Sequence, residues 1–126
     1  MVADDWVVSA DGGGSSTDVL LANIPLKTAL LKRGGGTNPN VYGDDGIKRL
    51  RKLMQKVLSE TDVAAKNVET CIVGMAGISH PKHRPTLKQT CEALFPQASL
   101  QLISDAELAH RTISVSYTHL TLPTKA

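Results

Sequence analysis

Aromatic residues, cysteines and long apolar runs are all scarce in this chain of 126 residues. One Phe, one Trp and two Tyr offer no row of stacking platforms for nucleic-acid bases. The 14 basic and 12 acidic residues are interspersed and give a net charge of +2, so no basic patch marks a nucleic-acid site. No apolar run approaches the roughly 20 residues that span a membrane. We therefore expect a small-molecule partner, with no nucleic acid and no membrane.

The two cysteines, Cys71 and Cys91, lack the close spacing typical of metal sites and redox motifs. Both fall in segments expected to be buried, so we interpret them as buried thiols in a reducing compartment rather than as a disulfide. Asp4 and Asp5 stand where a secretory signal would carry positive charge. These features predict a cytoplasmic protein, and a hydrophobic content of 41% predicts one domain with a core.

The most informative stretch is Asp11-Gly12-Gly13-Gly14-Ser15-Ser16-Thr17, directly after an apolar run. Glycine lets the backbone approach a ligand closely, and successive N–H groups in such a turn form an anion-binding concavity. The three hydroxyl side chains add donors, and Asp11 could hold a metal ion, Mg²⁺, through water. The alternative is a tight hairpin turn that binds nothing.

Strand patterns occupy residues 6–10, 19–21 and 28–31, and the turn-favouring residues 23–27 predict an antiparallel meander. Residues 70–75 and 100–104 are short apolar runs typical of buried parallel strands.

Three helices are expected, one beginning at a cap provided by Asp44 or Asp45, one from Pro85 to about Leu94, and one from Ala106. The first has the clearest apolar face, made of Ile47, Leu50, Leu53, Met54, Val57 and Leu58.

A polar segment, Thr37-Asn38-Pro39-Asn40, follows a second glycine triplet and is expected to be neither strand nor helix. The order of elements predicts a layered α/β domain, with a mixed five-stranded sheet and helices on both faces. Ligands of such sheets bind beyond the carboxyl ends of the strands. The glycine turn, the end of strand 70–75 and Asp105 are therefore expected to converge.

Four motifs in this order resemble a known family. They are the glycine turn, Thr37-Asn38, Val73-Gly74-Met75-Ala76-Gly77, and Ser104-Asp105-Ala106 followed by Ala109. The chain from Trp6 to about Ile113 is similar to the N-terminal lobe of the family that joins the BadF/BadG/BcrA/BcrD ATPases to N-acetylglucosamine kinase, within the sugar kinase, actin and Hsp70-type ATPase superfamily. The resemblance implies an actin-like, ribonuclease H-like lobe.

The resemblance also implies a set of functional residues. The phosphates of ATP would be contacted by Gly12, Gly13, Gly14, Ser15, Ser16 and Thr17, with Mg²⁺ held through water by Asp11. A sugar would be bound by Thr37, Asn38, Ala76 and Gly77, and Asp105 would be the general base. This implies an ATP-dependent kinase of an amino sugar such as N-acetylglucosamine, inactive as this lobe alone. A homodimer of the full-length protein is an open alternative.

The chain departs from the family pattern at three positions. Ser15 stands where threonine is frequent, Ser16 where a basic residue is frequent, and Ser104 where asparagine often precedes the aspartate. The basic contact is therefore absent, and the orientation of Asp105 is less constrained.

Two other functions remain open. One is an ATPase that activates a dehydratase or reductase through an iron–sulfur cluster, and the other is a non-catalytic sugar-binding regulator. Purely structural roles are also open for Asp105, as a helix cap, and for Asn38, as a turn residue. His80 and His83 lack a third ligand, so they do not define a metal site.

Residues 115–126 resemble the in-frame translation of a transposase adapter used in sequencing libraries, which implies a native lobe over residues 1–114. The alternative is a native, threonine-rich strand.

Overall fold

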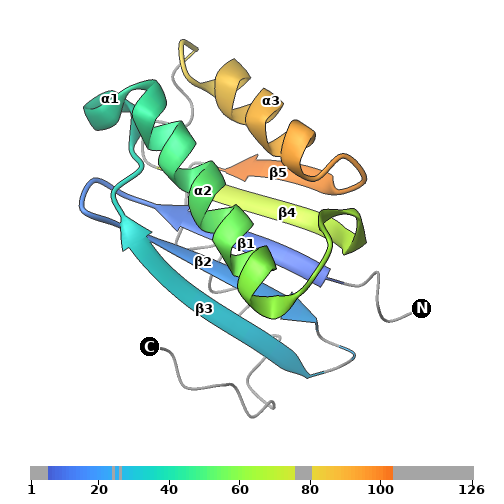
Figure 1. Ribbon diagram of the computed structural model, residues 1–126. Coiled ribbons are helices and arrows are strands. Elements are labelled where there is room, and N and C mark those ends of the chain that lie inside the picture. Colours follow the sequence, from blue (N-terminus) through green and yellow to red (C-terminus); the bar gives the residue numbers. More distant parts are fainter. Residues whose placement is uncertain (1–5, 24, 26, 76–80, 104–126) are drawn as a thin grey trace.

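The computed structural model describes residues 6–23, 25, 27–75 and 81–103. Five strands form one mixed sheet in the order β3-β2-β1-β4-β5 (Figure 1). The strands are β1 (Trp6–Gly12), β2 (Ser16–Asn23), β3 (Thr28–Gly35), β4 (Val68–Met75) and β5 (Ser99–Ile103). The first three form an antiparallel meander, and β4 lies parallel to both β1 and β5. This is the arrangement expected for an actin-like, ribonuclease H-like lobe.

The helices α2 (Asp44–Thr61) and α3 (Arg84–Leu94) lie side by side over one face of the sheet (Figure 1). α2 packs on β2 and β3, and α3 packs on β5. The third helix, expected from Ala106, lies outside the described residues. The expectation of helices on both faces is therefore tested for one face, which α2 and α3 cover. None of the helices in the described ranges is long and apolar enough to cross a membrane.

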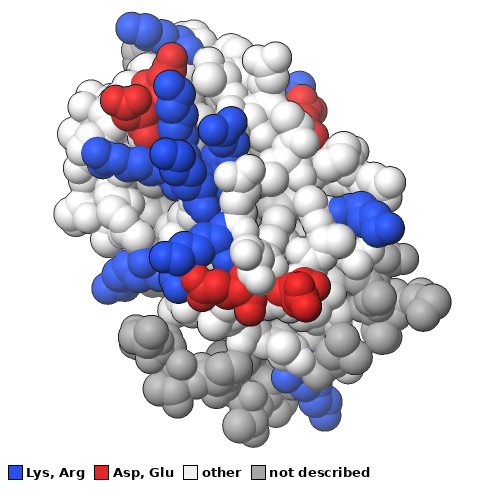
Figure 2. Space-filling view, viewed as in Figure 1, with Lys and Arg blue, Asp and Glu red and all other residues white. Residues whose placement is uncertain are grey.

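The core lies between these two helices and the sheet. Its fully buried large side chains are Phe95, Leu21, Ile47, Leu50, Met54, Met75, Leu87, Val8, Val19, Val57 and Val68. The apolar face predicted for residues 47–58 is confirmed, with Leu53 half-buried at its margin. The basic residues of α2 lie on its other side, exposed to solvent, and Figure 2 shows a band of positive charge there.

The element boundaries differ from the predictions in three ways. β1 and β3 run on to Gly12 and Gly35, and β2 begins at Ser16, because the strands stay paired past their apolar residues. A short helix, α1 (Pro39–Tyr42), occupies the segment expected to be irregular. α2 is capped by Gly43, without a side-chain hydrogen bond, while Asp44 and Asp45 lie in its first turn. Acids there are favourable because they face the positive end of the helix dipole.

The cysteines confirm the interpretation as buried free thiols. A hydrogen bond with Cys91, together with burial, raises the pKa of the Cys71 thiol. The Cys71 thiol therefore stays neutral in the folded state at physiological pH.

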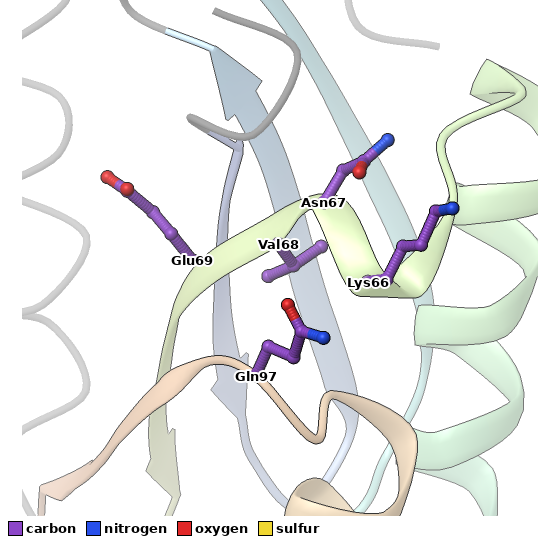
Figure 3. Close-up of a pocket in the computed structure, with 5 residues that line it drawn as sticks. All are labelled: Lys66, Asn67, Val68, Glu69 and Gln97. Carbon is purple, nitrogen blue, oxygen red and sulfur yellow. The ribbon is translucent and has the colours of Figure 1, made fainter. Parts of the chain in front are cut away.

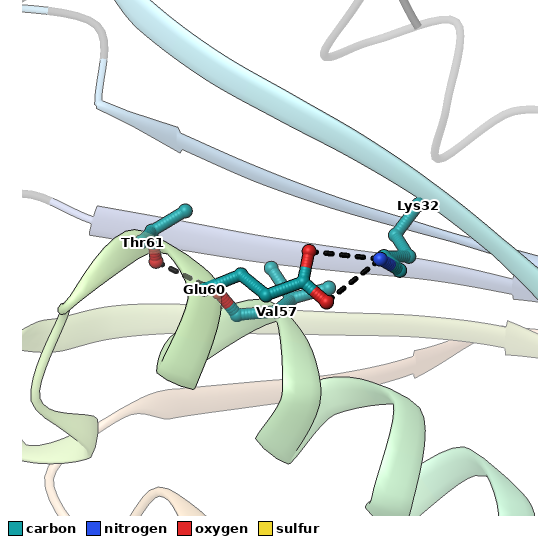
Figure 4. Close-up of polar contacts among 4 residues, drawn as sticks. All are labelled: Lys32, Val57, Glu60 and Thr61. Atoms are coloured by element: carbon teal, nitrogen blue, oxygen red, sulfur yellow. Dashed lines mark hydrogen bonds and ion pairs between the residues drawn. The ribbon is translucent and has the colours of Figure 1, made fainter. Parts of the chain in front are cut away.

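An ion pair joins the edge strand β3 to the last turns of α2 (Figure 4). Lys32 Nζ lies 2.8 and 2.7 Å from the two carboxylate oxygens of Glu60. This hydrogen bond lowers the pKa of Glu60 from its ordinary value. The stabilisation from the pair is therefore present at neutral pH, and it is lost as the pH falls through the lowered pKa of Glu60.

Lys32→Met is expected to raise the pKa of Glu60 toward its ordinary value, because it removes the hydrogen bond that lowers that pKa most. An NMR titration of the Glu60 carboxyl group measures the change. Lys56→Met is the matched control, since Lys56 contributes only a weaker Coulombic attraction. An equal rise in both variants would contradict the geometry of the pair.

Candidate functional site

The strands that carry the predicted site residues end at one edge of the sheet, which we name the carboxyl edge. The register pairs Gly12 at the end of β1 with Met75 at the end of β4. Gly35, at the end of β3, pairs with Ser16, and Ile103, at the end of β5, pairs with Gly74. The turn after β1 and the segment after β3 both leave the sheet here, as expected for a ligand-binding edge.

The glycine turn between β1 and β2 is shorter than the motif in the sequence and is formed by residues 13–15. Gly13 closes it by donating its N–H to the Ser16 carbonyl oxygen at 3.0 Å. Gly14 and Ser15 are exposed, and within the described residues no carbonyl accepts from their backbone N–H groups. Two free amides at the tip of a turn are suitable donors for a phosphate oxygen.

The glycine turn is bonded to the segment that follows β3. The Gly13 carbonyl oxygen accepts from the N–H groups of Thr37 and Asn38, at 3.0 and 3.2 Å. Beneath these bonds the hydroxyls of Thr17 and Thr37 lie 2.8 Å apart, and both residues are buried. The glycine turn, predicted to bind phosphate, and the segment Thr37-Asn38, predicted to bind a sugar, are thereby held next to each other, although they lie about 20 residues apart in the sequence.

Thr37→Val is expected to lower the free energy of unfolding by about 1–2 kcal/mol, because it leaves the buried Thr17 hydroxyl without a partner. The double variant Thr17→Val/Thr37→Val removes both hydroxyls and is expected to recover most of this loss. Urea denaturation of Thr17→Val, Thr37→Val and the double variant measures the three losses. If the double variant lost the sum of the two single losses, the hydroxyl pair would not be the source of the effect.

Asp11 lies near the end of β1, half-buried and directly opposite Asp18 on β2. Like charges at such paired positions repel. Arg33 offsets the repulsion, because its Nε and Nη2 lie 2.7 and 3.1 Å from the two Asp18 oxygens. This pairing raises the pKa of Arg33. Asp11 has no ion pair with a described residue, so its carboxylate is available to a ligand.

Three residues that sequence reasoning missed also hold the two loops. Tyr42 donates its hydroxyl to the Gly14 carbonyl oxygen at 2.6 Å, and the Arg49 guanidinium lies 4.4 Å from the centre of the Tyr42 ring. A Cβ atom at Gly36 would lie 2.8 Å from the Gly14 carbonyl carbon and from the Tyr42 ring, so only glycine fits this approach.

The segment Asn38-Pro39 carried a signal for α1, since Pro favours the first helical position and Asn caps it by accepting from the Asn40 N–H at 2.9 Å.

Other predicted site residues lie outside the described residues. These are Ala76, Gly77 and Asp105, together with His80 and the segment 115–126. Ala76 follows the end of β4 in sequence, and Asp105 comes two residues after the end of β5. Both strand ends lie at the carboxyl edge. The described residues contain no group of three or more His, Cys, Asp or Glu side chains placed to hold a metal ion.

Two surface hollows are separate from the glycine turn. One of about 430 Å³ lies where β4 and β5 begin, at the edge opposite the glycine turn, and is lined by Lys66, Asn67, Val68, Glu69 and Gln97 (Figure 3). Another of about 350 Å³ lies between β3 and α2 and is lined by Gly34, Gly35, Arg49, Lys52, Leu53 and Lys56. Neither contains a residue predicted to bind a ligand.

Comparisons with known proteins relate the chain to sugar kinases. No model of a known protein family matches it. It is 24% identical over 105 residues to an N-acetylmuramic acid/N-acetylglucosamine kinase of Clostridium acetobutylicum, a match that covers 82% of this chain and 34% of the kinase. A solved structure described as a reductive activator for a corrinoid, iron-sulfur protein matches with 17% identity and a TM-score of 0.41, over 73% of this chain and 17% of that one. The chain thus spans about a third of the curated relative's length.

Proposed function

We propose that this chain is the phosphate-binding, N-terminal lobe of an ATP-dependent kinase that phosphorylates an amino sugar such as N-acetylglucosamine. One observation carries the proposal. The Gly13 carbonyl accepts from both Thr37 and Asn38, so the loop suited to phosphate and the loop suited to a sugar meet at the carboxyl edge. The similarity to a sugar kinase supports the same interpretation.

Described and undescribed residues together would supply the groups that this reaction needs. The free N–H groups of Gly14 and Ser15 would donate to phosphate oxygens, and Asp11 would hold Mg²⁺ through water. ATP would supply the phosphoryl group that is transferred. Asn38, with Ala76 and Gly77, would contact the sugar, and Thr37, which is buried and bonded to Gly13 and Thr17, would hold that segment in place. Asp105 would accept the proton of the attacking hydroxyl. Transfer needs such positioning together with electrostatic stabilisation, most of which a single lobe does not provide.

The cysteines do not favour the activator alternative. An iron–sulfur cluster is held by cysteine thiolates. Cys71 and Cys91 are both buried in the core of the lobe, and Cys71 is held neutral by its raised pKa. A cluster in the complete protein would need cysteines from another segment.

The test is an ATP-coupled assay on the complete protein, with N-acetylglucosamine, N-acetylmuramic acid and glucose as acceptors. The expected result is ADP release that requires an amino sugar and stops when EDTA removes Mg²⁺. Sugar binding without ADP release would make the protein a regulator and overturn the kinase proposal. Bound iron together with sugar-independent ATP hydrolysis would favour the activator instead.

A further inference from the structure

Tyr42 and Arg49 join the two loops of the site from outside the sheet. Tyr42, in α1, donates its hydroxyl to the Gly14 carbonyl at 2.6 Å. Arg49, in α2, stacks on the Tyr42 ring and donates its Nη1 to the Gly36 carbonyl at 3.3 Å. Gly14 belongs to the glycine turn and Gly36 to the segment after β3. These four residues, which we call the frame, therefore connect the glycine turn to the segment after β3 by way of α1 and α2.

The core does not account for this frame. Arg49 is exposed and Tyr42 is only half-buried, while other residues of α2 form its buried face. Gly14 and Ser15 are exposed and Gly14 has no side chain, while the Gly14 carbonyl also lies close to the backbone of Gly36. The Tyr42 hydroxyl is therefore a principal constraint on the direction of the Gly14 carbonyl.

Fixing this carbonyl also fixes an N–H group. The Gly14 C=O and the Ser15 N–H belong to one planar trans peptide, so they point in opposite directions. With the carbonyl held by Tyr42, the Ser15 N–H faces away from α1 and is free to donate to a ligand. Without the hydroxyl bond no Cβ atom at Gly14 opposes rotation of this peptide unit, and the restraints that remain are the φ angle of Ser15 and the contact of the Gly14 carbonyl with Gly36.

We propose that Tyr42, supported by Arg49, is a positioning residue that orients the Gly14–Ser15 peptide so that the Ser15 N–H faces the nucleotide phosphates. This inference rests on the proposed function for the identity of the ligand. It predicts that the Tyr42 hydroxyl affects the kinetics with ATP more than the kinetics with the sugar.

Tyr42→Phe in this chain tests the orientation without any assay of activity. The variant keeps the ring beneath Arg49 and removes only the hydroxyl. Backbone ¹⁵N relaxation is expected to show the order parameters of Gly14 and Ser15 falling from about 0.85 to below about 0.6, with Gly35 unchanged. Arg49→Gln is expected to give a smaller fall in the same direction. Lys48→Gln, which removes a charge from an exposed neighbouring position of α2, is the matched control and should change nothing.

In the complete protein, Tyr42→Phe is expected to lower kcat/KM for ATP by about five- to tenfold, the factor that matches loss of one hydrogen bond. The kcat/KM for the sugar at saturating ATP should change less than about twofold, because a contact made equally with bound ATP and with the transition state cancels once ATP is saturating. Unchanged order parameters, or equal losses for both substrates, would overturn the inference even in an active kinase. If the wild-type protein showed no sugar-dependent turnover while the order parameters fell as expected, the proposed function would fail and the positioning of the peptide would stand.

Discussion

Asp105→Asn in the complete protein is expected to remove nearly all sugar-dependent turnover of ATP while leaving the fold intact. Asparagine keeps the size of the side chain, but it cannot accept the proton of the attacking hydroxyl. A positioned general base contributes about 100- to 10,000-fold to the rate, and kcat should fall by that factor. The coupled assay measures kcat, and the melting temperature and sugar affinity show whether the loss is confined to chemistry.

The same substitution separates catalysis from helix capping, the structural role left open for Asp105. Asparagine caps helices about as well as aspartate does, so a residue that only capped would tolerate this change. Asp45→Asn is the matched control, because Asp45 is an exposed acid in the first turn of α2. We expect this control to retain full turnover. Wild-type turnover in Asp105→Asn would remove Asp105 from the mechanism.

The parts of the fold that were predictable are those fixed by side-chain periodicity. The apolar spacing from Ile47 to Leu58 defines a helix because it places six side chains on one face. The run at 70–75 defines a buried strand because β-branched and apolar residues suit a strand in a sheet that helices cover. In the structure both elements lie at the centre of the core, where burial decides the conformation.

The errors occur where polar backbone contacts decide the conformation. Sequence patterns gave no reason for β2 to begin at Ser16, since the residues added there are hydroxyl-bearing rather than apolar. The strand extends because its backbone stays paired with β1 and β3 at these residues, and there the Thr17 hydroxyl lies beside that of Thr37, 20 positions away. The bond from Tyr42 to Gly14 spans 28 positions and is equally absent from any local pattern. The residues of the candidate site could thus be proposed from motifs, but the contacts that hold its two loops together could not.

One contact of the candidate site did have a local signal in the sequence, namely a glycine near the start of a predicted helix. Gly46 is buried in the first turn of α2. A glycine at such a position costs about 1 kcal/mol relative to alanine unless packing requires it. In the structure a Cβ atom at position 46 would lie 2.9 Å from the Thr37 carbonyl carbon and closer still to its oxygen. The small residue therefore lets α2 pack against the backbone of the candidate site.

Gly46→Val is accordingly expected to lower the free energy of unfolding by about 3 kcal/mol, the upper part of the range for overpacking, because a rotamer change cannot relieve an overlap with backbone. Urea denaturation measures the loss. Gly35→Val is the matched control, since nothing lies within 4 Å of a Cβ atom at Gly35. This control is expected to be neutral or stabilising, because valine suits a strand better than glycine does.

The position of the overlap also predicts where the damage begins. Thr37 can escape the side chain introduced by Gly46→Val only by moving relative to α2, and that movement strains its N–H bond to Gly13 and its hydroxyl bond to Thr17. Hydrogen exchange of the Thr37 amide should therefore accelerate in this variant by more than exchange of the Val8 and Val73 amides in the sheet. Uniform acceleration at all three positions would mean that α2 loosens as a whole. The contact at Gly46 would then support the fold without specifically positioning the candidate site.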